Sequence, residues 1–103
     1  MKIIFTDTAK NHLKSIYQYY KKEAGLKIAK SIKDSILKDI SKLKKHPQTG
    51  SKEIYLHSLQ KDYKKLVTGN YKVIYRIIDH FILIDTIFDS RQGPKELLKK
   101  LID

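Results

Sequence analysis

The sequence predicts an α+β domain in which a helical pair covers a mainly antiparallel sheet. Three observations predict this class. Between residues 6 and 45 the apolar side chains recur every three or four positions, the period of an amphipathic helix. From residue 63 onward they alternate or form short apolar runs, which is strand spacing. The chain has 103 residues, so we expect residues 1–103 to form a single domain around one core.

The first half of the chain should form one strand and a helical hairpin. Residues 2–5 are a short apolar strand, and Thr6 can cap the next helix because its hydroxyl can accept a bond from a free first-turn N–H. Gly25 interrupts the helical spacing and marks the break between two helices. The second helix should end near Lys45, because Pro47 disfavours helical geometry at the residue before it.

The second half should form the sheet. Extended structure is expected over residues 53–56, 63–67, 71–78 and 81–88. Thr68-Gly69-Asn70 is a turn signal, and Asp79-His80 can form a two-residue hairpin loop. Pro94 suits the first position of a short terminal helix. The expected order is therefore strand, helix, helix, strands and a short C-terminal helix.

Composition narrows the classes of function. Lys and Arg number 22 against 11 acidic residues, and the net charge of +11 favours a polyanionic or acidic partner. The chain has no cysteine, which excludes disulfides, thiolate nucleophiles and cysteine zinc sites. Its four histidines lack metal-ligand spacing, and no phosphate-binding glycine loop occurs, so we expect no metal and no cofactor. No apolar run approaches a membrane span, so we expect a cytoplasmic protein without membrane contact.

Segments spread over nearly the whole chain resemble the RelE/ParE superfamily of toxins from bacterial type II toxin–antitoxin modules. TDTAKNHLKSIYQYY is similar to the family's first helix. AKSIKDSILKDISKLKKHPQTG is similar to its second helix, which closes in Leu43, Pro47 and Gly50. NYKVIYRI resembles its Tyr-Arg-Val-x-Tyr strand, with Lys72 where Arg is usual, and IDTIFDSRQGP resembles the last strand and its basic exit at Arg91. The resemblance implies a β-α-α-β-β-β fold and a toxin that arrests growth.

The resemblance leaves two mechanisms open. The RelE branch cleaves mRNA in the ribosomal A site without a metal, whereas the ParE branch poisons DNA gyrase. The first helix, with Ile16, Tyr17 and Tyr20, and the exit after the last strand are more similar to the ParE side. We therefore favour a ParE-like toxin, with a RelE-like endonuclease as the alternative and a non-toxic basic nucleic-acid-binding domain as a third reading. The implied partners are a cognate antitoxin, in a possible hetero-oligomer, and a target that is either DNA gyrase or the ribosome with its mRNA.

The candidate functional residues are mostly basic. A guanidinium such as that of Arg91 can bind phosphate through two hydrogen bonds and stabilise charge on a scissile phosphate. If the chain is RelE-like, the catalytic candidates for proton transfer and charge stabilisation are Arg91, Lys72, Lys52 and His57. The candidates for binding the target or nucleic acid are Lys61, Lys64, Lys65 and Arg76.

Each candidate has a structural alternative. Lys72 and Arg76 should share one strand face, but Arg76 can instead pair with an acid. Tyr71 and Tyr75 should point into the core from the other face. Tyr63 lies within a basic segment in which bases could stack on aromatic rings. The lysines of the second helix are most simply a solvated face, with contact to nucleic acid or antitoxin as the alternative.

Overall fold

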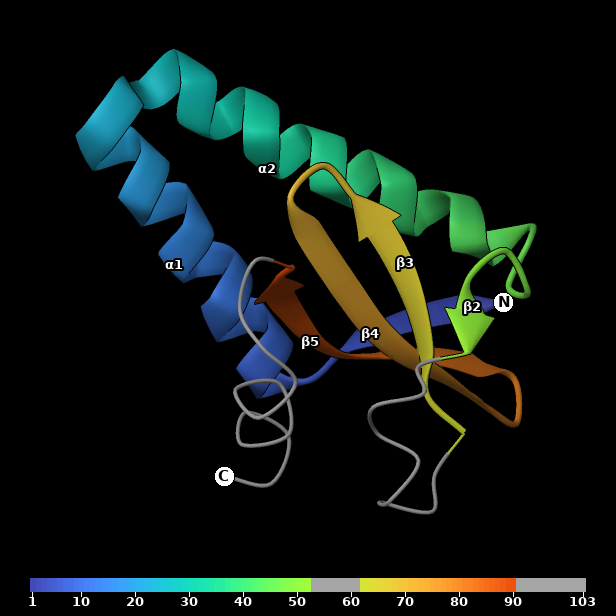
Figure 1. The fold of residues 1–103 in the computed structure, drawn as a ribbon. Helices are drawn as coiled ribbons and strands as arrows, with labels where there is room; N and C mark the ends of the chain where they lie inside the picture. Colours follow the sequence, from blue (N-terminus) through green and yellow to red (C-terminus); the bar gives the residue numbers. More distant parts are fainter. Residues whose placement is uncertain (53–61, 91–103) are drawn as a thin grey trace.

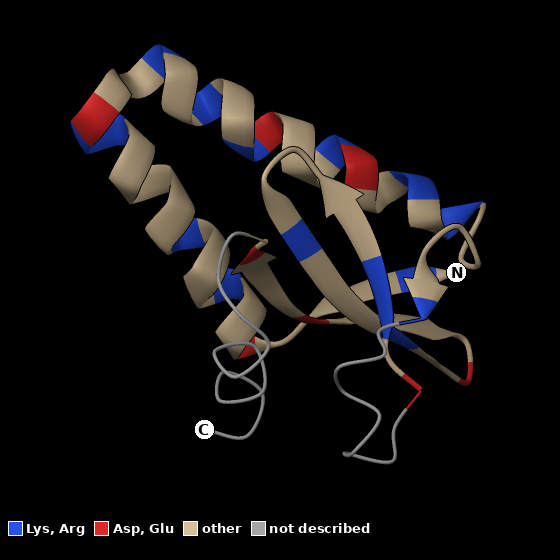
Figure 2. Ribbon diagram, in the orientation of Figure 1, with Lys and Arg blue, Asp and Glu red and all other residues tan. Residues whose placement is uncertain are grey.

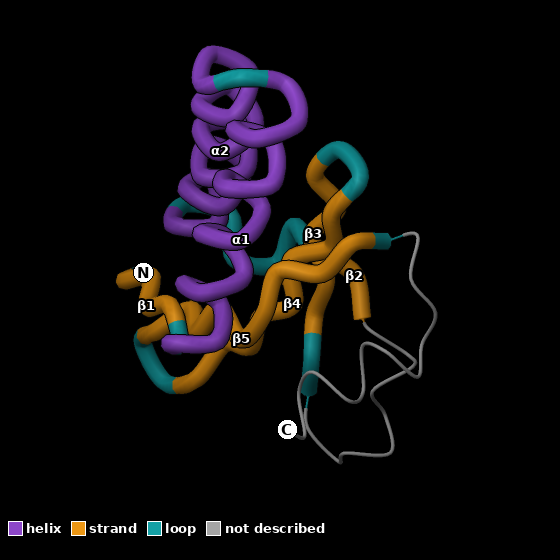
Figure 3. The backbone as a smooth tube through the Cα atoms, turned by 90° about the vertical axis from the view of Figure 1, so that its left-hand side faces the viewer, coloured by secondary structure: helices purple, strands orange, loops and turns teal. Residues whose placement is uncertain are grey.

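The computed structural model describes residues 1–52 and 62–90. Its elements are β1 (Lys2–Phe5), α1 (Asp7–Ala24), α2 (Leu26–Ser41), the 3-10 helix η1 (Lys42–Lys44), β2 (Ser51–Lys52), β3 (Lys64–Thr68), β4 (Tyr71–Ile78) and β5 (Phe81–Asp89). The two helices form an open V (Figure 1), and they lie to one side of the strands (Figure 3). This two-layer arrangement confirms the predicted α+β class. The expected extended segment 53–56 and the terminal helix after Pro94 lie outside the described residues.

The five-stranded sheet has the order β1-β5-β4-β3-β2. The strands β3, β4 and β5 form the antiparallel meander that the sequence predicts, and β2 adds to β3 in the same sense. The first strand is different, because β1 pairs parallel to β5, with Ile4 opposite Leu83. A parallel pair needs a long crossover connection. Here the connection runs through the helical hairpin and then through β2, β3 and β4, and the hairpin packs against one face of the sheet.

Thr6 connects the first strand, the first helix and the last strand. Its hydroxyl accepts a hydrogen bond from the Ala9 amide at 3.0 Å, which confirms the predicted cap. The same hydroxyl donates to the Asp85 carbonyl at 2.8 Å, and the Thr6 amide donates to the Ile84 carbonyl at 3.1 Å. The start of α1 is therefore fixed to the middle of β5.

The helical hairpin turns at Gly25, where the sequence predicts the break. Gly25 has φ +94°, a conformation that L side chains rarely adopt, so a glycine is needed there. The next helix buries Ala29, Ile36 and Ile40, of which Ile36 and Ile40 pack in one cluster with the sheet, and Leu43 of η1 continues the stripe. Neither helix of the described residues is long and apolar enough to cross a membrane.

The sheet face toward the helices forms the core. Tyr71, Val73 and Tyr75 of β4 pack in one cluster with the buried residues of α1 and α2, as do Ile82 and Ile84 of β5. Tyr75 is completely buried and Tyr71 is 8% exposed. The prediction that both tyrosines are core residues is confirmed.

The Tyr75 hydroxyl anchors the connection between α2 and the sheet. It donates a hydrogen bond to the Pro47 carbonyl and accepts one from the Gly50 amide, both at 2.9 Å. A Cβ atom at position 50 would lie 2.6 Å from the Lys65 carbonyl oxygen and still closer to the Tyr75 hydroxyl. Only glycine fits where the backbone at position 50 comes this close to the Tyr75 hydroxyl and the Lys65 carbonyl. Because the same hydroxyl holds both ends of this turn, Pro47 and Gly50 occur three residues apart after the helix.

A second polar link joins α2 to β3. The buried Thr68 hydroxyl donates to the Asp39 carboxylate at 2.7 Å, and Lys42 pairs with the same carboxylate at 3.3 Å. The hydrogen bond from Thr68 is the main cause that lowers the pKa of Asp39. Asp39 therefore stays ionised in this contact at neutral pH.

Replacing Tyr75 by Phe should destabilise the protein by about 1–3 kcal/mol, because the Gly50 amide and the Pro47 carbonyl both lose their partner. Burial raises the pKa of the Tyr75 phenol above 10.0. The stability that this group contributes is therefore full below pH 10 and is lost as the pH rises through the folded-state pKa. Urea unfolding at pH 7 and above pH 10 measures both effects. Tyr19→Phe is the control, because Tyr19 is 58% exposed; equal stability of the two variants at pH 7 would contradict the anchor.

Candidate functional site

The sheet face opposite to Tyr71, Val73 and Tyr75 carries three of the predicted basic residues. Lys65 pairs with Ile74, and Lys72 pairs with Val67, so the two lysines are diagonal neighbours across β3 and β4. Diagonal neighbours lie roughly 7–8 Å apart. Both side chains are partly exposed, and Figure 2 shows the basic positions along these strands. Two cations at this spacing can hold a phosphate or a carboxylate group.

Arg76 lies on the same face but is held by an acid. Its guanidinium donates two hydrogen bonds to the Asp85 carboxylate, at 2.9 and 3.2 Å. The two side chains are only 22% and 10% exposed. The hydrogen bond to Asp85 is also the main cause that raises the pKa of Arg76. The charge of Arg76 is therefore compensated within the sheet, which is the acid pairing that the sequence left open.

The partner of Arg76 comes from an irregularity that the sequence did not indicate. The register between β4 and β5 shifts between Ile74 and Tyr75, so Asp85 of β5 has no opposite residue. A bulge of this kind changes the direction in which a side chain points. It presents the Asp85 carboxylate to Arg76 on the neighbouring strand.

Tyr63 belongs to the same cluster. Its ring lies 5.2 Å from the Arg76 guanidinium, and only 4% of the residue is exposed. Burial is the main cause that raises the pKa of its phenol. The prediction that a base could stack on this ring is wrong for Tyr63, because its faces are already covered.

The other candidates do not join this cluster. Lys52 of β2 lies opposite Lys64 of β3, and by strand alternation both face away from Lys65. The described cations are thus divided between the two faces of the sheet. Arg91, His57 and Lys61 lie outside the described residues, so their predicted roles stay predictions. Within residues 1–52 and 62–90, no group of three His, Cys, Asp or Glu side chains could hold a metal ion.

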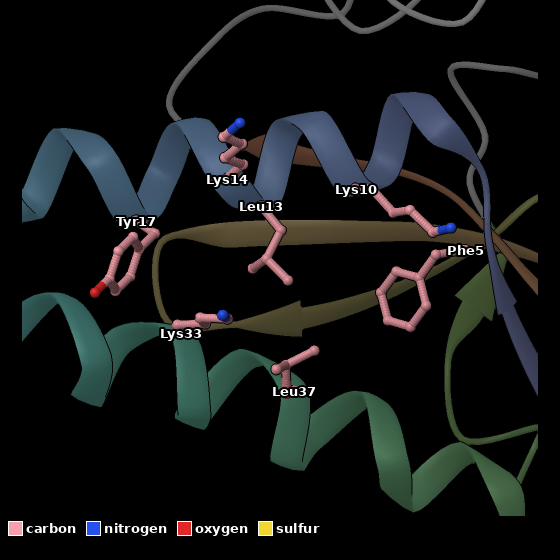
Figure 4. A pocket seen from close by; sticks show the side chains of 7 residues that line it. All are labelled: Phe5, Lys10, Leu13, Lys14, Tyr17, Lys33 and Leu37. Atoms are coloured by element: carbon pink, nitrogen blue, oxygen red, sulfur yellow. The ribbon is translucent and has the colours of Figure 1, made fainter.

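A groove between the two helices is a second candidate site. It has a volume of about 290 Å³. Figure 4 shows Phe5, Leu13, Tyr17 and Leu37 along the groove from β1, α1 and α2. A smaller hollow of about 200 Å³ shares Phe5 and Leu37 and continues between α2 and β1. The apolar floor is therefore elongated.

Lysines surround this apolar floor. Lys10 and Lys14 come from α1, Lys33 comes from α2, and Lys44 lies at the end of the neighbouring hollow. The Lys33 ammonium lies 5.3 Å from the centre of the Tyr17 ring. An apolar floor with a cationic rim suits an amphipathic acidic segment. The signal in the sequence was the lysines that flank the helical apolar stripes, of which we assigned those of the second helix, Lys33 among them, to a solvated face.

The structural role of Arg76 can be separated from its charge. Arg76→Lys keeps the positive charge but cannot reproduce the two-pronged contact with Asp85. We expect it to lower the free energy of unfolding by about 1.5–3 kcal/mol, the range for hydrogen bonds to charged groups. Lys65→Gln is the control on the same face, because the Lys65 side chain is partly exposed, and it should change stability by less than about 0.5 kcal/mol. Urea unfolding measures both variants, and a fully stable Arg76→Lys protein would show that the pair has no structural role.

Comparison with known proteins agrees with this architecture. The structure of the chromosomal ParDE toxin–antitoxin system from P. aeruginosa is similar, with a TM-score of 0.74 over 86% of this chain and 95% of that chain. The sequence identity is 19%, so this likeness shows the fold. Among curated proteins, none matches the sequence. The model of the family described as ParE toxin of the type II toxin–antitoxin system parDE matches residues 3–94. The chain therefore belongs to the ParE toxin family of type II toxin–antitoxin systems.

Proposed function

We propose that this protein is a growth-arresting toxin that acts by binding DNA gyrase in the cytoplasm and that a cognate antitoxin neutralises it. Membership of the ParE family over residues 3–94 is the observation that carries the proposal. The geometry of the described cations supports binding rather than catalysis. Arg76 is tied to Asp85, and Lys52 and Lys64 face away from Lys65, so these residues do not converge on one reacting group.

The antitoxin should occupy the groove between α1 and α2. The floor is apolar, and the rim carries Lys10, Lys14 and Lys33. An amphipathic helix or extended segment with acidic residues beside its apolar stripe would bury the floor and pair with the rim. The net charge of +11 would also speed the encounter with an acidic partner. The P. aeruginosa match is itself a ParDE system, which supports a partner of this kind.

Two assays on one preparation separate gyrase binding from RNA cleavage. Purified protein is added to a gyrase supercoiling reaction and to a cell-free translation reaction in which toeprinting maps cuts in ribosome-bound mRNA. We expect supercoiling to be inhibited while the message stays intact. Cut message with normal supercoiling would overturn the proposal and favour the RelE-like mechanism, in which Lys72, Lys52, His57 and Arg91 are the candidates. If supercoiling is normal and the message also stays intact, both the gyrase proposal and the RelE-like alternative are overturned.

The groove makes a prediction about the antitoxin. Lys10→Glu with Lys14→Glu should slow association with the cognate antitoxin about tenfold at low salt, because the rim then repels an acidic segment. The effect should shrink as the salt concentration rises, since exposed charges are screened. Stopped-flow or surface-based binding kinetics measure it.

The matched control is Lys2→Glu with Lys22→Glu. It makes the same change in net charge at two exposed positions, and neither residue lines the groove. Equal slowing of both variants would mean that net charge alone acts and that the groove does not hold the antitoxin. A circular dichroism melt confirms that both variants are folded.

A further inference from the structure

The side of α2 that faces away from the sheet carries a second ordered stripe. The buried stripe Ala29, Ile36, Ile40 and Leu43 follows helical spacing. A second stripe, offset by two residues and so on the opposite side of the helix, runs through exposed positions with the same spacing. It consists of Lys27, Lys30, Ser31, Asp34, Lys38, Ser41 and Lys45. We call it the lysine stripe.

The lysine stripe has the chemistry of a phosphate-binding surface. Its side chains are lysines and serines with a single aspartate, and none is apolar. None of its four ammonium groups has an ion-pair partner among the described residues. Figure 2 shows basic positions along the whole of α2. From Lys27 to Ser41 the stripe follows α2 for about 21 Å at the α-helical rise, and Lys45 follows η1.

We propose that the lysine stripe binds the phosphate backbone of duplex DNA. Duplex DNA carries one negative charge per roughly 1.7 Å of axis, and lysines that neutralise phosphates release bound counterions. Lysine and serine are residues that contact phosphate oxygens without reading sequence. A protein partner fits less well, because protein interfaces depend on apolar or aromatic anchors at their centre, and the stripe has none.

This inference goes beyond the proposed gyrase target and names a separate surface. The groove lies on the flank of α2 that carries Lys33 and Leu37, and the stripe meets the smaller hollow at Ser41. The four lysines of the stripe line neither of these two hollows and lie on the outward side of the helix. An enzyme that changes supercoiling holds duplex DNA, so a toxin bound to it would lie close to that DNA. The stripe then contributes affinity for the complex of gyrase with DNA rather than for gyrase alone.

Fluorescence anisotropy with a labelled duplex of about 20 base pairs tests the proposal without gyrase. We expect the wild-type protein to bind at about 50 mM salt, with an affinity that falls linearly on a double-logarithmic plot against salt. Lys38→Gln with Lys45→Gln should weaken binding about tenfold or more at that salt and make the slope shallower by about 1.8. Lys2→Gln with Lys22→Gln, which removes the same charge elsewhere, should weaken binding less than about threefold.

Three results would overturn the proposal. The first is no binding by the folded wild-type protein at low salt. The second is an equal loss of affinity in the stripe variant and its charge-matched control, which would mean that net charge acts without a site. The third is tighter binding through the stripe to an RNA duplex of the same length than to DNA, which would reassign the surface to RNA. DNA binding without inhibition of supercoiling would leave the inference standing and refute the gyrase target, so the two proposals fail separately.

Discussion

The buried hydroxyl of Tyr75 is the contact on which the arrangement of the two layers depends. It holds the Pro47 carbonyl and the Gly50 amide at once, so the chain that leaves the helical layer is fixed to the centre of the sheet. Without a partner, these part-buried backbone groups would each carry a desolvation cost. Because the contact sits between η1 and β2, it also sets where β2 joins the edge beside β3.

The parallel pairing of β1 with β5 explains why the molecule has two unlike surfaces. Between these strands the chain forms first the helical hairpin, which covers one face of the sheet, and then β2, β3 and β4. The two helices diverge (Figure 1) and leave the lysine-rimmed groove between them. The other face of the sheet keeps Lys65 and Lys72 partly exposed. The two faces therefore differ in chemistry, with an apolar groove and its lysine rim on one and partly exposed lysines of the sheet on the other.

The bulge at Asp85 decides which cations are available. Asp85 is tied through its carbonyl to Thr6 and through its carboxylate to Arg76. Its burial is tolerated because the carboxylate is paired and hydrogen-bonded. Arg76 therefore has a structural role. Lys72 lies two residues before Ile74 and Arg76 lies two residues after it, and the Lys72 side chain is partly exposed.

The sequence by itself determined the types and the order of β1, α1, α2, β3, β4 and β5, because hydrophobic period, the Thr6 cap and the glycine at position 25 act over a few residues. It did not indicate β2 or η1. It also placed Tyr71 and Tyr75 in the core by strand alternation. Only the tertiary structure decided the parallel partner of β1, the acid that holds Arg76, the burial of Tyr63 and the groove between the helices. The pairing of β1 with β5 and the groove join segments far apart in the chain, and a local pattern carries no information about which distant segment a face or an edge will meet. Arg76 and Asp85 are only nine residues apart, but their contact depends on a bulge that the local pattern does not indicate.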